Sequence, residues 1–423
     1  MTQPRSAWCM GILVILTGIL LTASPAPAIG QQQVILRFPS WQWGQPGYDQ
    51  FLSAAIAEFE KTHPNVKFQK TPVASASYAD DLVKMFAAND PPEIVQYLSQ
   101  LFYKAAAAGW LDPLDSNLEQ TDIAKTWSRY LLDAGRVGGK TYGVWVSGYS
   151  NSLMYNKQML QEAKVSVPKT PEQLVAAAKA LTKKQSDGTV SQFGYSLTTK
   201  MDNNAYLYGF SSFLIGEGGG WGKDAGHLDV MNDANKKAIE VERDLIKAGV
   251  VPLDADRIKA RQLFYQGKAA MIIEGPWVMT SAKTENPKLL PDLGVAPIPF
   301  PNQAAGPSNG FAIAKNQKHK ELAWEFIKMI TSEPWMQKYG EMTGVTPARQ
   351  GALTQKALQD NPWLSIFAEN EKTGKSYLVP GLQDVDSEIN KSVVNHLHGV
   401  FFGDKSPGQA LTEIKTDIEK LAK

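Results

Sequence analysis

The sequence contains little cysteine and no excess of charge of either sign. Cys9 is the only cysteine and lies among the first 30 residues, so the rest of the chain has neither a disulfide nor a thiol, which suits an oxidising compartment. Arg5 is the only charged residue of those 30, and the remainder carries 42 basic and 42 acidic residues. Nucleic-acid-binding proteins need a basic excess to neutralise phosphates, so no nucleic-acid partner is predicted.

The sequence also lacks common catalytic and metal-binding motifs. No His-Glu-x-x-His, Gly-x-Ser-x-Gly or Cys/His cluster occurs, and the five histidines include one close pair, His396 and His398. That spacing is weak evidence for a metal site and is more typical of a helical surface, so neither a metal nor a cofactor is predicted. The glycine-rich run 216–222 lacks the preceding strand and the Lys-Ser/Thr ending of a phosphate loop, which argues against nucleotide binding.

Residues 1–30 are typical of a secretory signal peptide. Arg5 precedes an apolar run, 11–21, and small residues at 23–28 follow, so cleavage is expected after Ala28 or Gly30. The run is shorter than the ~20 residues of a membrane-spanning helix, which leaves a membrane anchor as the less favoured alternative. A lipoprotein needs a cysteine at the cleavage site, whereas Cys9 precedes the run, so a lipid anchor is not expected.

The remaining chain, of about 390 residues, is too long for one ordinary core, which favours two domains. Near its start, apolar strands and amphipathic helices alternate. The sequence predicts strands at Val34–Phe38, Val66–Phe68 and Glu93–Tyr97, with helices at Tyr48–His63 and Asp80–Ala88 between them. This alternation predicts an α/β fold with a mainly parallel sheet.

The segment Phe264–Trp277 combines a buried strand with a candidate binding turn. Gly267 is typical of the end of a short helix that begins at Ala260. The apolar run Ala269–Ile273 predicts a buried strand, and Glu274-Gly275-Pro276-Trp277 then ends it and carries an aromatic ring into a loop. Open α/β sheets bind ligands at such strand ends, although a purely structural turn is the alternative.

Four segments, in this order, resemble motifs of the extracellular solute-binding proteins of ABC transporters, in the sugar-binding branch that includes the maltose-binding protein. They are 138–145 with 151–157, 264–277, 306–313 and 344–349. A further stretch, Asn89–Tyr97, is similar to another family motif, with Glu93 where aspartate is commoner. Each motif is short, but together they extend over nearly the whole chain.

The resemblance implies an α/β, periplasmic-binding-protein-like fold of type II, in which two lobes are joined by a hinge. It places three crossings near 146–150, 270–276 and 310–315. The N-terminal lobe would comprise 31–147 and 277–312, and the C-terminal lobe 148–276 and 313–423. The implied protein is a periplasmic monomer without enzymatic activity. It would capture a neutral sugar, oligosaccharide or polyol between its lobes and deliver it to the permease subunits of a membrane transporter.

The candidate ligand-binding residues combine aromatic rings with amides, hydroxyls and one carboxylate. Rings can stack on the apolar faces of sugars, and the polar groups can bind their hydroxyls, although packing in a core is the alternative for each ring. Arg349 brings the only positive charge to the predicted cleft segments, and it could equally pair with an acid of the second lobe. The set is Trp41, Trp43, Gln45, Tyr97, Ser99, Gln100, Tyr149, Asn151, Tyr208, Trp221, Glu274, Gly275, Trp277, Ser308, Asn309 and Arg349.

Two other functions remain open from the residues alone. Acids beside aromatic rings are also found in secreted glycoside hydrolases, which need two carboxylates about 5–10 Å apart. Glu274 is one candidate, and the sequence offers no obvious second. A cleft-binding chemoreceptor adaptor without transport would differ only in its partner.

Overall fold

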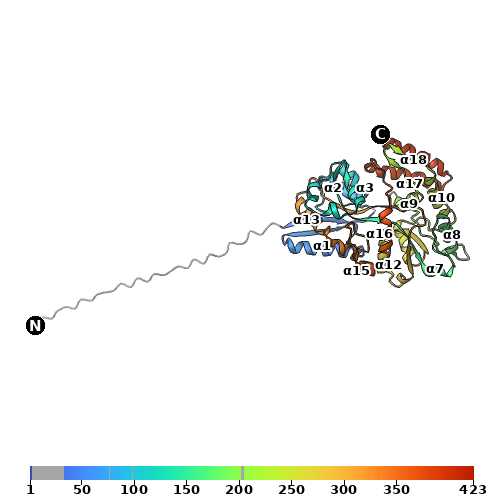
Figure 1. Ribbon diagram of the computed structural model, residues 1–423, viewed down its shortest axis with the longest axis horizontal. Helices are drawn as coiled ribbons and strands as arrows, with labels where there is room; N and C mark the ends of the chain where they lie inside the picture. Colours follow the sequence, from blue (N-terminus) through green and yellow to red (C-terminus); the bar gives the residue numbers. More distant parts are fainter. Residues whose placement is uncertain (2–32, 76, 98, 202–203) are drawn as a thin grey trace.

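The computed structural model describes residue 1 and residues 33–75, 77–97, 99–201 and 204–423. The predicted signal peptide, residues 1–30, lies outside this part apart from Met1. The described chain forms two lobes that lie side by side, with α1, α2, α3 and α13 in one and α7–α10, α17 and α18 in the other (Figure 1). No helix in the described ranges is both long and apolar enough to cross a membrane.

The first part of the chain builds most of the first lobe. Its elements are β1 (Val34–Ser40), α1 (Tyr48–Thr62), β2 (Val66–Pro72), α2 (Tyr78–Ala87), β3 (Val95–Tyr97), α3 (Ser99–Ala107), α4 (Asp115–Leu118), α5 (Ile123–Thr126), α6 (Arg129–Ala134), β4 (Arg136–Val137), β5 (Lys140–Thr141) and β6 (Val144–Ser150).

The middle of the chain builds the second lobe. Its elements are β7 (Ser152–Asn156), α7 (Lys157–Glu162), α8 (Pro171–Leu181), β8 (Lys183–Lys184), β9 (Val190–Gln192), α9 (Asn204–Gly216), β10 (Gly222–Asp224), β11 (His227–Leu228), α10 (Asp233–Lys247), α11 (Arg257–Tyr265), β12 (Met271–Glu274), α12 (Trp277–Glu285), η1 (Leu290–Asp292) and β13 (Leu293–Ala296).

The last part of the chain contributes to both lobes. Its elements are β14 (Ala305–Ala312), α13 (Lys320–Ile330), α14 (Glu333–Thr343), α15 (Gln355–Asp360), α16 (Leu364–Thr373), η2 (Gln383–Val385), α17 (Asp386–Phe402) and α18 (Pro407–Leu421). The predicted helix end at Gly267 is confirmed by its left-handed φ of 72°. Trp277, however, is the first residue of α12 and not part of a loop.

The prediction of a mainly parallel sheet is wrong for the ladders that flank the hinge. Strands β1 and β2 pair in parallel, but β14 pairs antiparallel with both β3 and β6, and β7 pairs antiparallel with both β12 and β13. The reason is the path of the chain. In each lobe, one strand that leads away from the hinge lies between two strands that run towards it. In the first lobe, Ala305 at the start of β14 pairs with Ser150 at the end of β6, whereas β3 pairs further along β14, at Gly310–Ala312.

The hydrophobic cores do not follow the predicted bounds of the lobes. The first core combines residues 36–146 with residues 311–352, so α13 and α14 belong to the first lobe. Their apolar faces complete that core, since Phe326 packs on Phe38 at 6.1 Å and Tyr339 on Phe51 at 5.1 Å. Helix α12 and strand β13, predicted for the first lobe, pack instead with buried residues of β7 and β12.

The crossings of the hinge differ accordingly from the predicted ones. The first follows β6, as predicted, but the chain then remains in the second lobe until β14 carries it back, and residues 311–314 lie buried in the first core. The third connection runs through α15 and α16. Three segments meet at the hinge, because Ala305 pairs with Ser150 and its amide donates to the Lys375 carbonyl (2.9 Å).

Two glycines allow side chains to pack directly on the hinge strands. A Cβ atom at Gly148 would lie 1.8 Å from the Tyr130 hydroxyl, and one at Gly306 would lie 2.8 Å from the Tyr149 ring. Real Cβ contacts are never that close, so only glycine fits at these positions of β6 and β14. The space at Gly306 lets the Tyr149 ring pack directly on β14, where the candidate site begins.

Candidate functional site

Three aromatic rings form a continuous cluster beside the hinge. Tyr149 comes from β6, Tyr208 from α9 and Trp277 from α12. The Tyr149 and Tyr208 ring centroids are 4.8 Å apart, and those of Tyr208 and Trp277 are 5.8 Å apart. Tyr149 is buried, whereas Tyr208 and Trp277 are half-buried. The structure thus brings together three predicted site residues that are far apart in the sequence.

Hydrogen bonds tie this cluster to the start of the second lobe. The Tyr208 hydroxyl donates to Oδ1 of Asn151 (2.5 Å), and Nδ2 of Asn151 donates to the Ser212 hydroxyl (2.6 Å). Burial raises the pKa of Tyr208 well above its usual value, and the charge of Glu274 raises it further. The phenol therefore stays protonated and acts as a donor. Asn151 was among the predicted site residues, whereas Ser212 was not.

Glu274 is held by donors on both of its oxygens. Arg261 donates to Oε1 from Nε (2.8 Å) and contacts it with a second guanidinium nitrogen at 2.7 Å. The Gly275 amide (2.9 Å) and the Trp277 indole nitrogen (3.1 Å) donate to Oε2. The predicted residues 274, 275 and 277 are therefore linked through one carboxylate. A general acid must donate a proton to its substrate, whereas both oxygens of this carboxylate accept hydrogen bonds from the protein.

Two arginines of α11 overturn the expectation that only Arg349 brings positive charge near the cleft. The guanidinium of Arg257 lies 5.5 Å from the centre of the Tyr208 ring, and that of Arg261 lies 5.5 Å from the centre of the Trp277 ring. Both precede β12 in the sequence, and their spacing of four residues was a usable signal, since it places them on one helix face. Arg349 itself pairs with Asp122, within the first lobe.

The first lobe contributes a buried network of side-chain amides from neighbouring strands. The Ser40 hydroxyl donates to Oε1 of Gln96 (2.5 Å), and Nε2 of Gln96 donates to Gln42 and to Asn309 (2.7 Å each). Ser40 ends β1, Gln42 follows it, and Gln96 and Asn309 lie within β3 and β14; all four are buried. Asn309 was predicted. Gln42 and Gln96 were not, although each lies beside a predicted residue, Trp43 or Tyr97.

Tyrosines extend this network towards the second lobe. The Tyr339 hydroxyl donates to the Ser147 hydroxyl (3.0 Å) and also bonds Asn309 and Tyr48. Burial raises the pKa of Tyr339 to about 12. Burial also raises the pKa of Tyr48 well above its usual value, and the charge of Arg261 acts in the opposite direction. Tyr48 belongs to the first lobe and Arg261 to the second.

Two of the predicted residues lie in the cores, and two more are half-buried beside the first core. Tyr97 is 1% exposed and packs on Phe102 (5.7 Å), and Trp221 is 2% exposed in the second core. Trp41 packs edge-on against Tyr78 (4.8 Å), and the Trp43 indole donates to the Phe38 carbonyl (2.9 Å). Tyr97 and Trp221 therefore fit the packing alternative, whereas the half-buried Trp41 and Trp43 remain candidates for ligand binding.

The remaining predicted residues have less definite places. Gln45 is half-buried, and its backbone N–H donates to the backbone carbonyl of Gln42 (3.0 Å). Ser308 is half-buried in the bulge of β14 between the residues paired with Gly148 and Ser147. Ser99 and Gln100 open α3, and their side chains lie outside the described part of the structure.

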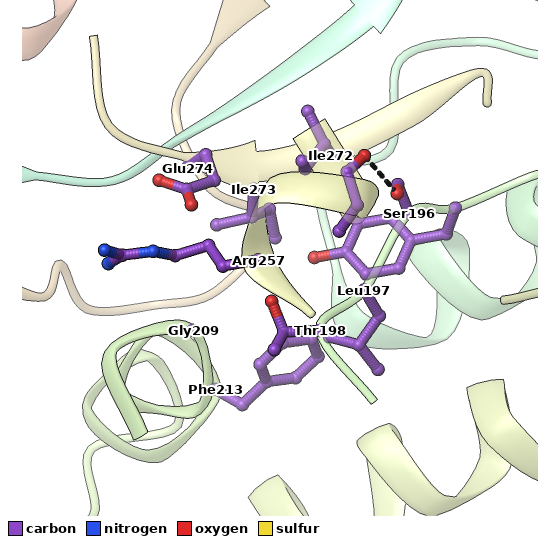
Figure 2. A pocket seen from close by; sticks show the side chains of 11 residues that line it. Ser196, Leu197, Thr198, Gly209, Phe213, Arg257, Ile272, Ile273 and Glu274 are labelled. Carbon is purple, nitrogen blue, oxygen red and sulfur yellow. Dashed lines mark hydrogen bonds between the residues drawn. The ribbon is translucent and has the colours of Figure 1, made fainter. Parts of the chain in front are cut away.

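A small cavity adjoins the site on its second-lobe side (Figure 2). Arg257 and Glu274 lie on one side of it and Phe213 on another, and the Ser196 hydroxyl at its edge donates to the Ala260 carbonyl (2.7 Å). Its volume, about 20 Å³, suffices for roughly one water molecule and not for a ligand of several heavy atoms. No group of three or more potential metal ligands occurs among the described residues.

Comparison with protein families gives a match over most of the chain. The family described as "Bacterial extracellular solute-binding protein" matches residues 43–337. One similar relative is the diacetylchitobiose binding protein DasA of Streptomyces coelicolor. It is 26% identical over 394 residues, which cover 90% of this chain and 88% of the relative.

Solved structures are similar over the same extent. The GacH receptor of Streptomyces glaucescens, solved unliganded and with acarbose, has a TM-score of 0.80 at 22% identity and covers 92% of this chain and 99% of its own. A solute binding protein of an ABC transporter from Thermotoga lettingae, bound with α-D-tagatose, has a TM-score of 0.82 at 20% identity. It covers 93% of this chain and 100% of its own.

Proposed function

Because the chain belongs to the bacterial extracellular solute-binding protein family, we propose that it binds a neutral sugar, oligosaccharide or sugar-derived polyol between its two lobes. The family predicted from the sequence motifs is therefore confirmed. So is the α/β, periplasmic-binding-protein-like fold of two lobes, which the similar structures share. The bound solute would be delivered to the permease subunits of an ABC transporter.

The observation that carries this proposal is the pairing of two surfaces of different chemistry beside the hinge. The second lobe presents the rings of Tyr208 and Trp277, which suit the apolar faces of a sugar ring. The first lobe holds a buried network of amides and phenols beside the hinge, represented by Gln42, Asn309 and Tyr339, and groups of this kind suit the hydroxyls of a sugar. Of the three similar proteins described above, one is named for diacetylchitobiose and two were solved with acarbose or tagatose bound, which agrees with this class of ligand.

The strongest charges of the site are partly compensated within it. Glu274 pairs with Arg261 at 2.7 Å, while Arg257 lies against the Tyr208 ring. The Glu274 carboxylate is unsuited to act as a general acid, because its oxygens accept from Arg261, Gly275 and Trp277. We therefore infer a binding protein without enzymatic activity, acting as a monomer in the periplasm after removal of residues 1–30.

A ligand screen tests the proposal directly. The protein would be heated with diacetylchitobiose, acarbose, tagatose, ribitol, and charged controls such as glutamate and glucose 6-phosphate. At least one neutral carbohydrate or polyol should raise the midpoint of unfolding, because a ligand that binds the folded state stabilises it by mass action. Stabilisation by the charged compounds alone would refute the proposed class of ligand.

A further inference from the structure

Arg261 lies where it can control the orientation of the Trp277 ring. It belongs to α11, and its side chain is 20% exposed, whereas that of its partner Glu274 is 7% exposed. The guanidinium has two contacts with the same carboxylate oxygen, Oε1, at 2.8 and 2.7 Å. Charge-assisted hydrogen bonds of this kind are stronger than those between neutral groups.

The other oxygen of the same carboxylate holds the indole. Oε2 of Glu274 accepts from Nε1 of Trp277 at 3.1 Å and from the Gly275 amide at 2.9 Å. Gly275 belongs to the turn that leads into α12. One carboxylate oxygen is therefore held by a side chain of α11 and the other by the backbone of this turn. Loss of the arginine would leave a buried carboxylate without its counter-charge, which is costly enough to move it.

The ring is thus restrained at its edge and on its face. The indole N–H is bound by Glu274, the guanidinium of Arg261 lies 5.5 Å from the ring centre, and Tyr208 packs at 5.8 Å with an angle of 46°. Trp277 nevertheless remains half-buried, so part of the ring is accessible. A side chain that is already ordered loses less conformational entropy when a ligand binds.

We propose that Arg261 is a positioning residue: acting through Glu274, it holds the Trp277 indole in the orientation that receives the ligand. The effect on affinity rests on the proposed function, whereas the effect on the ring does not. The two can therefore be tested separately, first in the protein alone and then with carbohydrate.

The first test follows the Trp277 ring by fluorine NMR of protein labelled with 5-fluorotryptophan. Trp277→Phe identifies the resonance by its loss. Arg261→Met and Glu274→Gln should each shift or broaden that resonance, and Lys259→Met, which removes an exposed charge from the same helix, should leave it unchanged. An unchanged Trp277 resonance in folded Arg261→Met would overturn the proposal, even if the variant is less stable.

The second test is a double-mutant cycle with whichever of diacetylchitobiose, acarbose or tagatose binds the wild type most tightly. Arg261→Met should weaken binding about tenfold, equivalent to ~1.4 kcal/mol. In a Trp277→Ala background the same substitution should have no further effect, because Arg261 acts through the ring. A tenfold loss that persists there would mean that Arg261 contacts the carbohydrate itself, which would refute the positioning role. Absence of any binding by the wild type would contradict the proposed function and leave the NMR test decisive.

Discussion

Glu242 should make the stability of the protein fall with rising pH, and Glu242→Gln should remove the contribution of this residue. The residue lies on α10 in the core of the second lobe and has no exposed surface. Neither carboxylate oxygen has a hydrogen-bond partner among the described residues, and the Tyr206 hydroxyl is the polar group that faces them. Burial raises the pKa of Glu242 from 4.5 to about 8, with the Tyr206 hydroxyl opposing the change.

The direction and the magnitude both follow from this pKa. Below pH 4.5 the carboxyl is protonated in the folded and the unfolded chain. Between pH 4.5 and about 8 it ionises only in the unfolded chain, so the folded state binds more protons and the free energy of unfolding decreases with pH. One pH unit corresponds to 1.36 kcal/mol, so the whole interval amounts to about 5 kcal/mol, which is an upper bound.

Urea unfolding of the wild type and Glu242→Gln at pH 5, 7 and 9 measures this effect. The glutamine variant should gain several kcal/mol over the wild type between pH 5 and pH 9. Glu371 and Asp386, whose pKa values burial raises to about 8 and about 7, are present in both proteins and cancel in the difference. Glu240→Gln, a half-buried position on the same helix, is the matched control. Parallel pH profiles for wild type and Glu242→Gln would refute the reasoning.

Three further predictions concern ligand binding. Trp277→Ala should weaken carbohydrate binding by about 1–3 kcal/mol, the scale of a lost aromatic contact, and unchanged affinity in calorimetry would assign the ring to packing alone. A binding protein should return its carbohydrate intact after long incubation, as chromatography can check, whereas hydrolysis abolished by Glu274→Gln would favour a glycosidase. Affinity should be nearly independent of ionic strength because a neutral ligand neutralises no charge, and a tenfold loss between low and high salt would contradict this.

Local patterns in the sequence predicted the elements well. The apolar spacing of Phe51, Ala55 and Phe59 places the helix predicted at Tyr48–His63, which is α1, and a Ser406/Gln409 capping box begins α18. Both features depend on residues within one or two helical turns of each other. The bounds of the lobes depend on contacts between distant segments. The apolar stripe of α13 shows that this helix is buried, but it does not show which core the helix joins.

The site was predicted in part, for a similar reason. Tyr149, Glu274 and Trp277 lie in or directly after a strand or turn whose chemistry is visible locally, whereas Tyr208 lies inside α9. Whether a ring such as Tyr97 faces a cleft or a core depends on which side of a three-residue strand is covered, and so short a strand gives no alternation to decide it. The Arg261–Glu274 pair joins two elements across a turn, and only the packing of α11 against β12 brings it together.

The interleaved path of the chain sets an order for folding. The first core cannot be completed until residues 311–352 are available, although its first strand begins at Val34. A chain made from its N-terminus must therefore produce the whole of β7–β13 before the earlier lobe can close. Such a delay keeps strand edges and apolar surface unsatisfied for most of synthesis. The first residues of the chain resemble an export signal. Late completion of the first core would keep such a chain extended and competent for translocation, without a separate segment that delays folding.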